Sequence, residues 1–509
     1  MKAFLMYRDR DFDLQRQLPW NEQALTQDLE LNTLFDAMAG GDKFLFQVAK
    51  VAALSGFEND HDTILYRQNV LKDCLKNPAV ARAIYEMAVR AIENEKKVWS
   101  FWGKYPAGIL SRARDVLQIS IPMLKKLRAV ADEHADRCES EGFRAFFAML
   151  KNELGEEYFA TMEGHLKEVK FRDGVLISAE LGKGNKGTNW VLRKPQETDR
   201  SWIKRIFAPG PPAYTFHLHP RDEGGARALS ELNNRGINLV ANALAQSADH
   251  VLSFFNMLRT DLAFYVACLN LHEQLAKKGE PMTFPVPVSS PERGHSFHGL
   301  YDICLTLTVQ EPVVGNDANA DGKDLIIITG ANQGGKSTFL RSIGLAQLMM
   351  QCGMFVPAGS FRGNICDGLF THYKREEDVK MESGKLDEEL GRMSGIVDNM
   401  TPNALLLFNE SFAATNEREG SEIARQITSA LLENRIKMFF VTHLYEFAHR
   451  WFDKKMDNLL FLRAERRADG VRTFKMVEAE PLDTSYGPDL YERIFDAREK
   501  SREPANFFQ

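Results

Sequence analysis

The spacing of apolar residues divides the chain into a helical first part and a mixed second part. Apolar side chains recur at three- and four-residue intervals over residues 61–100 and 110–165, as in amphipathic helices. The same spacing from Ile237 to Leu269 predicts one long amphipathic helix, or two in line. From about residue 300 onward, short apolar runs alternate with helical patterns, which favours an α/β sheet.

Residues 166–220 do not follow the helical pattern around them. Short apolar runs at 175–178 and 190–192 predict two strands, and glycines lie between them. Prolines and a glycine between residues 279 and 291 end the long helix and indicate a domain boundary. The predicted segments are an N-terminal helical segment (1–60), a helical core (61–165), a small β-containing, clamp-like insertion (166–220), a long helix that returns to the last domain (221–290) and an α/β domain (291–509).

One short segment in the α/β part carries the clearest chemistry. Gly330 to Ser337 fits the phosphate-binding pattern of a glycine, four residues and Gly-Lys-Ser. An apolar, β-branched run precedes it at 325–328, and helical spacing follows Lys336. A strand, a glycine turn and a helix point backbone N–H groups and a helix N-terminus at a polyphosphate. The segment therefore predicts a nucleotide phosphate site.

Each residue type in this loop has a physical reason to be there. Gly330, Gly334 and Gly335 permit backbone angles and a close approach that a Cβ atom would block. Lys336 can reach the β- and γ-phosphates as a point charge. The Ser337 hydroxyl is a hard oxygen of the kind that Mg²⁺ prefers.

Two further apolar runs end in polar residues, as strands of an ATPase sheet do. The run at 403–410 ends in Asn409 and Glu410, and Glu410 could orient or deprotonate a water that attacks the γ-phosphate. The run at 438–443 ends in His443, which could hydrogen-bond the γ-phosphate. The alternatives are a helix-capping carboxylate for Glu410 and a structural histidine for His443.

These motifs, in this order, resemble the MutS family, the mismatch-repair branch of the ABC-type ATPases. The resemblance covers about residues 300–490 and is diffuse before that. It implies an α/β P-loop (ABC-type) ATPase domain behind a helical core and lever region, with ATP and Mg²⁺ as cofactors. The matching segments are 311–316, 329–338, 353–358, 409–420, 442–447 and 485–487.

The resemblance also implies roles for individual residues. Ser337 and Asn409 would hold Mg²⁺, Glu410 and His443 would be catalytic, and Ser383 would contact the γ-phosphate of a second subunit. The pairing of two such domains implies a homodimer with composite sites, although Ser383 could instead be an ordinary helix N-cap. The other residues implied to contact the nucleotide are Val313, Val314, Gly330, Asn332, Gln333, Gly334, Gly335, Lys336 and Thr338.

The sequence departs from the family pattern at two places. Asn409 stands where the family normally has an aspartate, so it supplies an oxygen but no charge to Mg²⁺, and we expect slower hydrolysis or weaker Mg²⁺ binding. The mismatch-reading Phe-X-Glu motif occurs only as Phe408-Asn-Glu410, within the predicted strand. We therefore expect a MutS-like protein without the N-terminal mismatch-recognition domain.

Positive charge is concentrated in the glycine-rich region and predicts contact with DNA. Such residues suit non-sequence-specific phosphate contacts, although a solvated loop is an equal alternative. Nearby His217 and His219 are read as two histidines on one face of a strand rather than as metal ligands, because no further ligands are spaced for zinc. The basic and aromatic residues are Lys183, Lys186, Trp190, Arg193, Lys194, Arg200, Trp202, Lys204 and Arg205.

Composition sets the remaining limits. Apolar residues make up 44% and charged residues 26% of the chain, and the net charge of −6 excludes a globally basic nucleic-acid binder. No apolar run approaches the roughly 18 residues of a membrane span, and no signal-peptide core is visible. Six scattered cysteines indicate a cytoplasmic protein without a membrane partner.

Two functions remain open. The first is an ATP-gated dimeric clamp on duplex or branched DNA, in DNA repair or recombination. The second is an ATP-gated conformational scaffold that acts on protein or ribonucleoprotein without binding DNA. A metabolic kinase is disfavoured, because nothing in the sequence resembles an acceptor-substrate site.

Overall fold

The computed structural model describes residues 1–98, 105–171, 174–194, 216–375 and 384–482, which form two compact units. The helical unit comprises Met1–Ala3, Arg82–Glu139 and Phe143–Arg259, and the sheet unit comprises Phe4–Ala81, Ser140–Gly142 and Thr260–Gln509. The chain therefore enters the sheet unit, leaves it and returns. The five segments expected from the sequence stay predictions, although most of the first one packs in the sheet unit.

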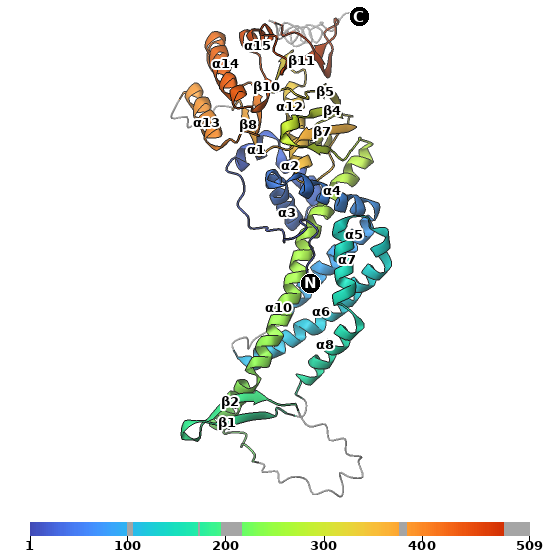
Figure 1. Cartoon of the computed structure of the whole chain (residues 1–509), viewed down its shortest axis with the longest axis vertical. Coiled ribbons are helices and arrows are strands. Elements are labelled where there is room, and N and C mark those ends of the chain that lie inside the picture. Colours follow the sequence, from blue (N-terminus) through green and yellow to red (C-terminus); the bar gives the residue numbers. More distant parts are fainter. Residues whose placement is uncertain (99–104, 172–173, 195–215, 376–383, 483–509) are drawn as a thin grey trace, which may run out of the picture. The chain divides into compact units, whose positions relative to one another are not determined.

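The helical unit is built mainly from long helices, with one β-hairpin (Figure 1). Helix α6 begins with Pro106, whose fixed φ angle suits the first turn and whose missing N–H is not needed there. The elements are α5 (Pro78–Lys96, whose first residues lie in the sheet unit), α6 (Pro106–His134), α7 (Glu141–Glu153, whose first two residues lie in the sheet unit), α8 (Glu156–Glu168), β1 (Ile177–Leu181), β2 (Gly187–Leu192) and the first part of α10 (Glu223–Lys278).

The hairpin of β1 and β2 is anchored to two helices of its own unit. Leu110 of α6 packs with Ile237 and Ala241 of α10 in a buried apolar cluster. Val175, which precedes β1, and Leu192 of β2 pack against the same cluster. The base of the hairpin is therefore held by apolar burial, whereas Leu181 near its turn is 81% exposed.

Helix α10 is the long helix predicted from the apolar spacing, and it runs unbroken from Glu223 to Lys278. By length and composition alone it could cross a bilayer, but 67% of its most apolar window is buried inside the protein. A core helix of a folded domain has the same properties.

The sheet unit contains two sheets and the helices around them (Figure 1). Its helices are α1 (Glu22–Asp28), α2 (Leu31–Ala39), α3 (Lys43–Leu54), α4 (His61–Lys76), the end of α10, α11 (Ile303–Thr308), α12 (Lys336–Gln351), α13 (Lys385–Asn399), α14 (Glu417–Glu433) and α15 (Tyr445–Phe452). Its strands are β3 (Val286–Val288), β4 (His295–Leu300), β5 (Asn316–Asn319), β6 (Leu325–Gly330), β7 (Ser360–Asn364), β8 (Leu369–Tyr373), β9 (Leu405–Asn409), β10 (Lys437–Val441), β11 (Leu459–Arg466) and β12 (Arg472–Glu478).

The larger sheet has the order β12-β11-β6-β10-β9-β8, and the smaller one has the order β3-β7-β4-β5. Strands β8, β9, β10, β6 and β11 are parallel to one another, and β12 is antiparallel at the edge. Parallel strands covered on both faces are apolar throughout, which explains the uninterrupted runs in the sequence. The register places Ile328 of β6 opposite Val441 of β10, and Val441 opposite Asn409 of β9.

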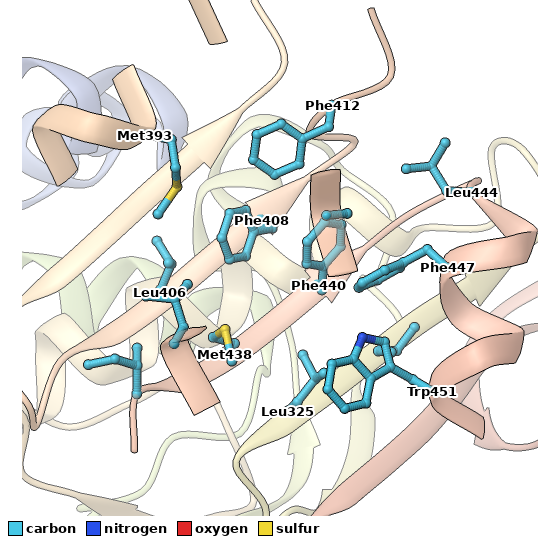
Figure 2. Close-up of a cluster of buried hydrophobic side chains, with 14 of the residues drawn as sticks. Leu325, Met393, Leu406, Phe408, Phe412, Met438, Phe440, Leu444, Phe447 and Trp451 are labelled. Carbon is cyan, nitrogen blue, oxygen red and sulfur yellow. The ribbon is translucent and has the colours of Figure 1, made fainter. Parts of the chain in front are cut away.

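One face of this sheet carries an aromatic core (Figure 2). Phe408 of β9 and Phe440 of β10 stack with their ring centroids 4.6 Å apart, and Phe447 of α15 lies 4.8 Å from Phe440. Trp451 of α15 and Phe412 belong to the same buried cluster. Each such aromatic side chain buries a large apolar area, so this cluster fixes how the strands align.

The first residues of the sheet unit are bound to the end of α10. The backbone N–H groups of Leu5 and Met6 donate to Asp261 Oδ2 over 2.9 and 3.4 Å, and the Tyr265 hydroxyl donates to Leu5 O over 2.6 Å. Arg67 Nε donates to Met6 O over 2.9 Å. Burial raises the pKa of Asp261 to about 7. Segments more than 250 positions apart thus share one hydrogen-bonded layer.

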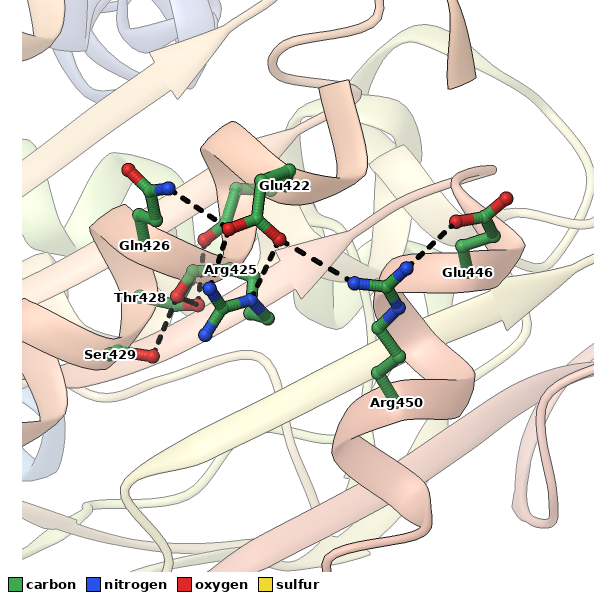
Figure 3. A network of polar contacts seen from close by, with 8 residues as sticks. Glu422, Arg425, Gln426, Thr428, Ser429, Glu446 and Arg450 are labelled. Carbon is green, nitrogen blue, oxygen red and sulfur yellow. Dashed lines mark hydrogen bonds and ion pairs between the residues drawn. The ribbon is translucent and has the colours of Figure 1, made fainter. Parts of the chain in front are cut away.

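A surface network joins the two helices that follow β9 and β10 (Figure 3). Arg450 of α15 lies 3.5 Å from Glu422 of α14 and 3.3 Å from Glu446 of its own helix. Arg425 pairs with Glu422 over 2.6 Å. Exposed ion pairs of this kind each stabilise by only about 0–1 kcal/mol, so the network orients the helices more than it holds them.

Most elements follow the sequence expectations, with one clear error. The strands expected at 325–328, 403–410 and 438–443 are β6, β9 and β10, and the hairpin strands lie near the positions expected. The prediction of a strand carrying His217 and His219 is wrong. These residues lie in irregular backbone, where the Arg221 N–H donates to His219 Nδ1 over 3.2 Å.

Gly330, at the end of β6, tests how tightly this sheet is packed. Its φ of +108° disfavours any side chain, and a Cβ atom would lie 2.8 Å from the Ala464 backbone nitrogen of β11. Since backbone cannot move aside easily, we expect Gly330→Ala to lower the free energy of unfolding by about 1–3 kcal/mol. Calorimetric unfolding of the sheet unit measures this loss.

Gly391→Ala is the matched control, because a Cβ atom at Gly391 on α13 would meet nothing within 4 Å. We expect it to raise the free energy of unfolding by roughly 0.5–1 kcal/mol, as alanine does in helices. Equal melting temperatures for the two variants would contradict the tight packing of Gly330.

Candidate functional site

The predicted phosphate loop connects a fully buried strand to a largely buried helix. Strand β6 ends at Gly330, and α12 begins at Lys336, with Gly335 as its N-cap at φ +87°. Gln333 within the loop also has a positive φ of 59°. The Phe339 N–H donates to Gly335 O over 2.9 Å, which starts the helix. The strand, glycine turn and helix expected from the sequence are therefore present, with the N-terminus of α12 open to the loop.

Lys336 is held inside this loop. Its Nζ atom donates to Gly330 O over 2.9 Å and to Ala331 O over 3.0 Å. The residue is 5% exposed, and burial lowers the pKa of its ammonium to about 8, while nearby Glu410 opposes that shift. The Lys336 ammonium therefore lies beside the loop backbone, where little water screens its positive charge.

The two predicted Mg²⁺ ligands contact each other. The Ser337 hydroxyl in the first turn of α12 donates to Asn409 Oδ1, at the end of β9, over 2.9 Å. The loop and the β9 strand end therefore meet at this point. A hydroxyl and an amide oxygen are both hard donors that suit Mg²⁺, but neither carries charge.

The two predicted catalytic residues also contact each other. His443 Nε2 lies 2.9 Å from Glu410 Oε1, and because a carboxylate only accepts, the ring N–H is the donor. This hydrogen bond is the main reason that the pKa of Glu410 is lowered, so the carboxylate is ionised at neutral pH. The Glu410 N–H donates to Val441 O over 2.9 Å, which joins the ends of β9 and β10.

A cavity of about 650 Å³ lies beside the loop. Its walls are largely apolar and come from the segment after β4, the loop, α12 and β12, and such a lining suits a flat ring system. The predicted nucleotide contacts that line it are Val313, Val314, Gln333, Gly335 and Thr338. Asn332 and Gly334 belong to the same loop but do not line this cavity.

Phe474 of β12 is a wall of the cavity that the sequence did not reveal. It is 48% exposed, has a φ of 61° and lies in a strand of mixed polarity, so no local pattern singles it out. The side chain of Asn316 holds the backbone of β12 beside the cavity. Asn316 Nδ2 donates to Phe474 O over 3.2 Å, and the Met476 N–H donates to Asn316 Oδ1 over 2.7 Å. Only the pairing of distant strands brings Phe474 to the loop.

The remaining predicted residues are outside this site. Ser383 lies outside the described residues, and so do Arg200, Trp202, Lys204 and Arg205. Lys183 and Lys186 are exposed in the turn of the β-hairpin of the helical unit. Within the described part of the chain, no group of three or more His, Cys, Asp or Glu residues could hold a metal ion.

The other predicted DNA contacts have partners within the helical unit. Lys194 pairs with Glu168 over 2.9 Å, and Arg193 Nε donates to Ser178 Oγ over 2.9 Å. The Trp190 ring lies over Gly187 and donates from Nε1 to Gly187 O over 3.1 Å. The Trp190 side chain therefore packs within the hairpin and stabilises its turn.

Comparison with known proteins places these features in one family. The model of the MutS2 N-terminal domain matches residues 59–278, and the model of MutS domain V matches residues 326–494, so the two cover most of the chain. The site described above lies largely within the second match.

Curated relatives match over a shorter stretch. MutS protein homolog 4 of Mus musculus is 32% identical over 151 residues, which are 30% of this chain and 16% of that protein. The DNA mismatch repair protein MutS of Porphyromonas gingivalis is 35% identical over 145 residues, 28% of this chain and 16% of that protein. Its counterpart in Clostridium botulinum (strain Alaska E43 / Type E3) is 32% identical over 181 residues, 34% of this chain and 19% of that protein. The matches thus span less than a fifth of these relatives, but with both domain models they show that the chain belongs to the MutS family.

Proposed function

We propose that this chain is a Mg²⁺-dependent ATPase that works as a homodimer on DNA. One observation carries the proposal: Lys336, the Ser337–Asn409 pair and the Glu410–His443 pair meet at the same edge of three adjacent parallel strands, β6, β10 and β9. Ligands of open α/β sheets bind outside the carboxyl ends of the strands.

The site's geometry supports ATP as the nucleotide. The adenine would occupy the 650 Å³ cavity beside Val313, Val314 and Phe474, and the phosphates would lie over the loop at the N-terminus of α12. The helix dipole and the Lys336 ammonium both favour an anion there. Ser337 and Asn409 would hold Mg²⁺, which supplies charge neutralisation at the phosphates.

Hydrolysis would depend on Glu410. Its carboxylate is ionised and held by His443, so it can orient or deprotonate a water beside the γ-phosphate. His443 would fix the direction of the carboxylate and hydrogen-bond the phosphate. Phosphoryl transfer needs little covalent chemistry from the protein, so this positioning is the main contribution.

The homodimer and the DNA contact rest on the family and on charge. Ser383 precedes α13 and would contact the nucleotide of the second subunit. The exposed lysines of the hairpin turn, Lys183 and Lys186, would contact DNA phosphates without reading sequence. The second candidate, a conformational scaffold without DNA, is favoured by the engagement of Arg193, Lys194 and Trp190 within the helical unit.

Substitution of the proposed catalytic carboxylate tests the proposal directly. We expect Glu410→Gln to keep ATP binding, to lower kcat by about 100-fold or more and to accumulate a nucleotide-bound dimer. Steady-state ATPase assays and light scattering with ATP measure these effects. Glu433→Gln, an exposed site on α14, is the control and should match the parent protein. Parent-rate hydrolysis by Glu410→Gln would refute the assignment.

Substitution at the neutral Mg²⁺ ligand has the opposite expectation. Asn409→Asp adds a negative charge where Ser337 already lies within 2.9 Å, so we expect tighter Mg²⁺ binding and a faster kcat. A Mg²⁺ titration of the ATPase rate separates the two effects. Asn69→Asp, an exposed position on α4, controls for the added charge. If Asn409→Asp leaves both quantities unchanged, the charge deficit at Asn409 has no role.

The salt dependence of DNA binding separates the clamp from the scaffold. A clamp should bind duplex or branched DNA with an affinity that falls steeply as salt rises from about 50 to 200 mM, in proportion to its phosphate contacts. Lys183→Glu with Lys186→Glu should weaken binding and flatten this slope. Lys125→Glu with Lys126→Glu on α6 makes the same charge change elsewhere. No binding by the parent protein at about 50 mM salt would favour the scaffold.

A further inference from the structure

The turn that follows β9 has an unfavourable backbone that something must hold. Glu410 has a φ of 55° and Phe412 has a φ of 63°, and neither is a glycine. A bulky side chain at positive φ costs of order 1–3 kcal/mol and persists only where the surroundings enforce it. The turn carries the proposed catalytic carboxylate, so whatever enforces its shape also determines where Glu410 points.

A buried histidine of the neighbouring strand contacts the middle of this turn. Ser411 Oγ lies 2.7 Å from His372 Nδ1 and 2.6 Å from His372 O, and both residues are fully buried. His372 belongs to β8, which pairs in parallel with β9 so that His372 lies opposite Phe408. One hydroxyl hydrogen therefore serves two acceptors of the same residue.

The other ring nitrogen of His372 contacts helix α13. His372 Nε2 lies 3.0 Å from Glu389 O, and since a carbonyl cannot donate, the ring N–H is the donor. Burial lowers the pKa of His372 to about 4, so the ring is neutral and its Nδ1 accepts from Ser411. The imidazole thus bridges the turn and the helix, with one hydrogen bond to each.

Phe412 closes the arrangement. Its ring is fully buried and stacks on His372 at a centroid distance of 5.2 Å, and it belongs to the aromatic core that also contains Met393 of α13 (Figure 2). The nearby Phe412 backbone N–H opposes the rise in the pKa of Glu389 that burial causes, and Glu389 itself is 4% exposed. Glu410 and Phe412, the two residues of this turn with positive φ, therefore flank or make contacts with side chains of β8 and α13.

We propose that His372, Ser411 and Glu389 are positioning residues that hold the 410–412 turn against α13, and with it the Glu410 carboxylate. The inference rests on the proposed hydrolytic role of Glu410. None of the three contacts the reacting atoms, and they act through the shape of the turn.

Removal of the Ser411 hydroxyl is the first test. Ser411→Ala should lower kcat by about 10- to 100-fold, because small displacements of a catalytic group are costly, while the Kd for ATP stays within about twofold. Ser120→Ala is the matched control: its hydroxyl is also buried and donates to Val116 O over 2.7 Å, but in the helical unit. The two variants should lose similar thermal stability, and only Ser411→Ala should lose kcat.

A pair of substitutions at Glu389 is the second test and does not depend on the folding of Ser411→Ala. Glu389→Ala removes the buried carboxylate beside the Phe412 backbone and should lower kcat as Ser411→Ala does. Glu389→Gln keeps an amide oxygen in that place and should restore most of the rate. Both variants should bind ATP as the parent does, because the Lys336 loop is untouched.

Two results would overturn the proposal. In the first, Ser411→Ala and Glu389→Ala hydrolyse ATP with the kcat of the parent protein, while Glu410→Gln is inactive. This result would refute the positioning role but leave the proposed function intact. The other is an equal loss of rate in Glu389→Ala and Glu389→Gln, which would indicate a charge effect and not a positioned turn. A parent protein without ATPase activity would instead remove the proposed function, and this inference with it.

Discussion

The parallel pairing of β6, β10 and β9 is the constraint on which the rest of the site depends. Because Ile328, Val441 and Asn409 lie at one level of the sheet, the loop after Gly330, the Glu410 turn and His443 emerge at the same edge. A slip of one residue would turn each side chain to the opposite face and separate these groups. The stacked Phe408 and Phe440 rings sit on the two strands that must stay aligned, so the core sets the register of the site.

The sequence predicts those parts of the fold whose cause is local. Helical spacing locates α10, and short uninterrupted apolar runs locate β6, β9 and β10, because burial of one face or of both faces selects apolar residues in a local pattern. Phe474 and His372 leave no such record. Phe474 reaches the cavity only through strand pairing, and His372 meets Ser411 across 39 positions. The strand expected at His217 is absent for a related reason. The alternation of two histidines, both exposed, gives no apolar face that burial in a sheet would stabilise.

The electrostatics of the site concentrate on one carboxylate. Lys336 is partly stripped of water and Asn409 is neutral, so among the residues that meet at the loop Glu410 supplies the negative charge. The hydrogen bond from His443 keeps the Glu410 carboxylate ionised. The buried network around Ser411 keeps the backbone of Glu410 in an unfavourable conformation. Local strain of this kind is common where a group must be presented in one orientation.

The interleaving of the two units has a consequence for synthesis of the protein on the ribosome. Residues Phe4–Ala81 belong to the sheet unit, yet the partners of Leu5 and Met6 at the end of α10 are made only after Thr260. At about 5–20 residues per second, the apolar faces of α2, α3 and α4 wait roughly 10–35 s before their partners exist. During that interval the nascent chain exposes apolar helix faces that the folded protein buries, and such surface is prone to aggregate.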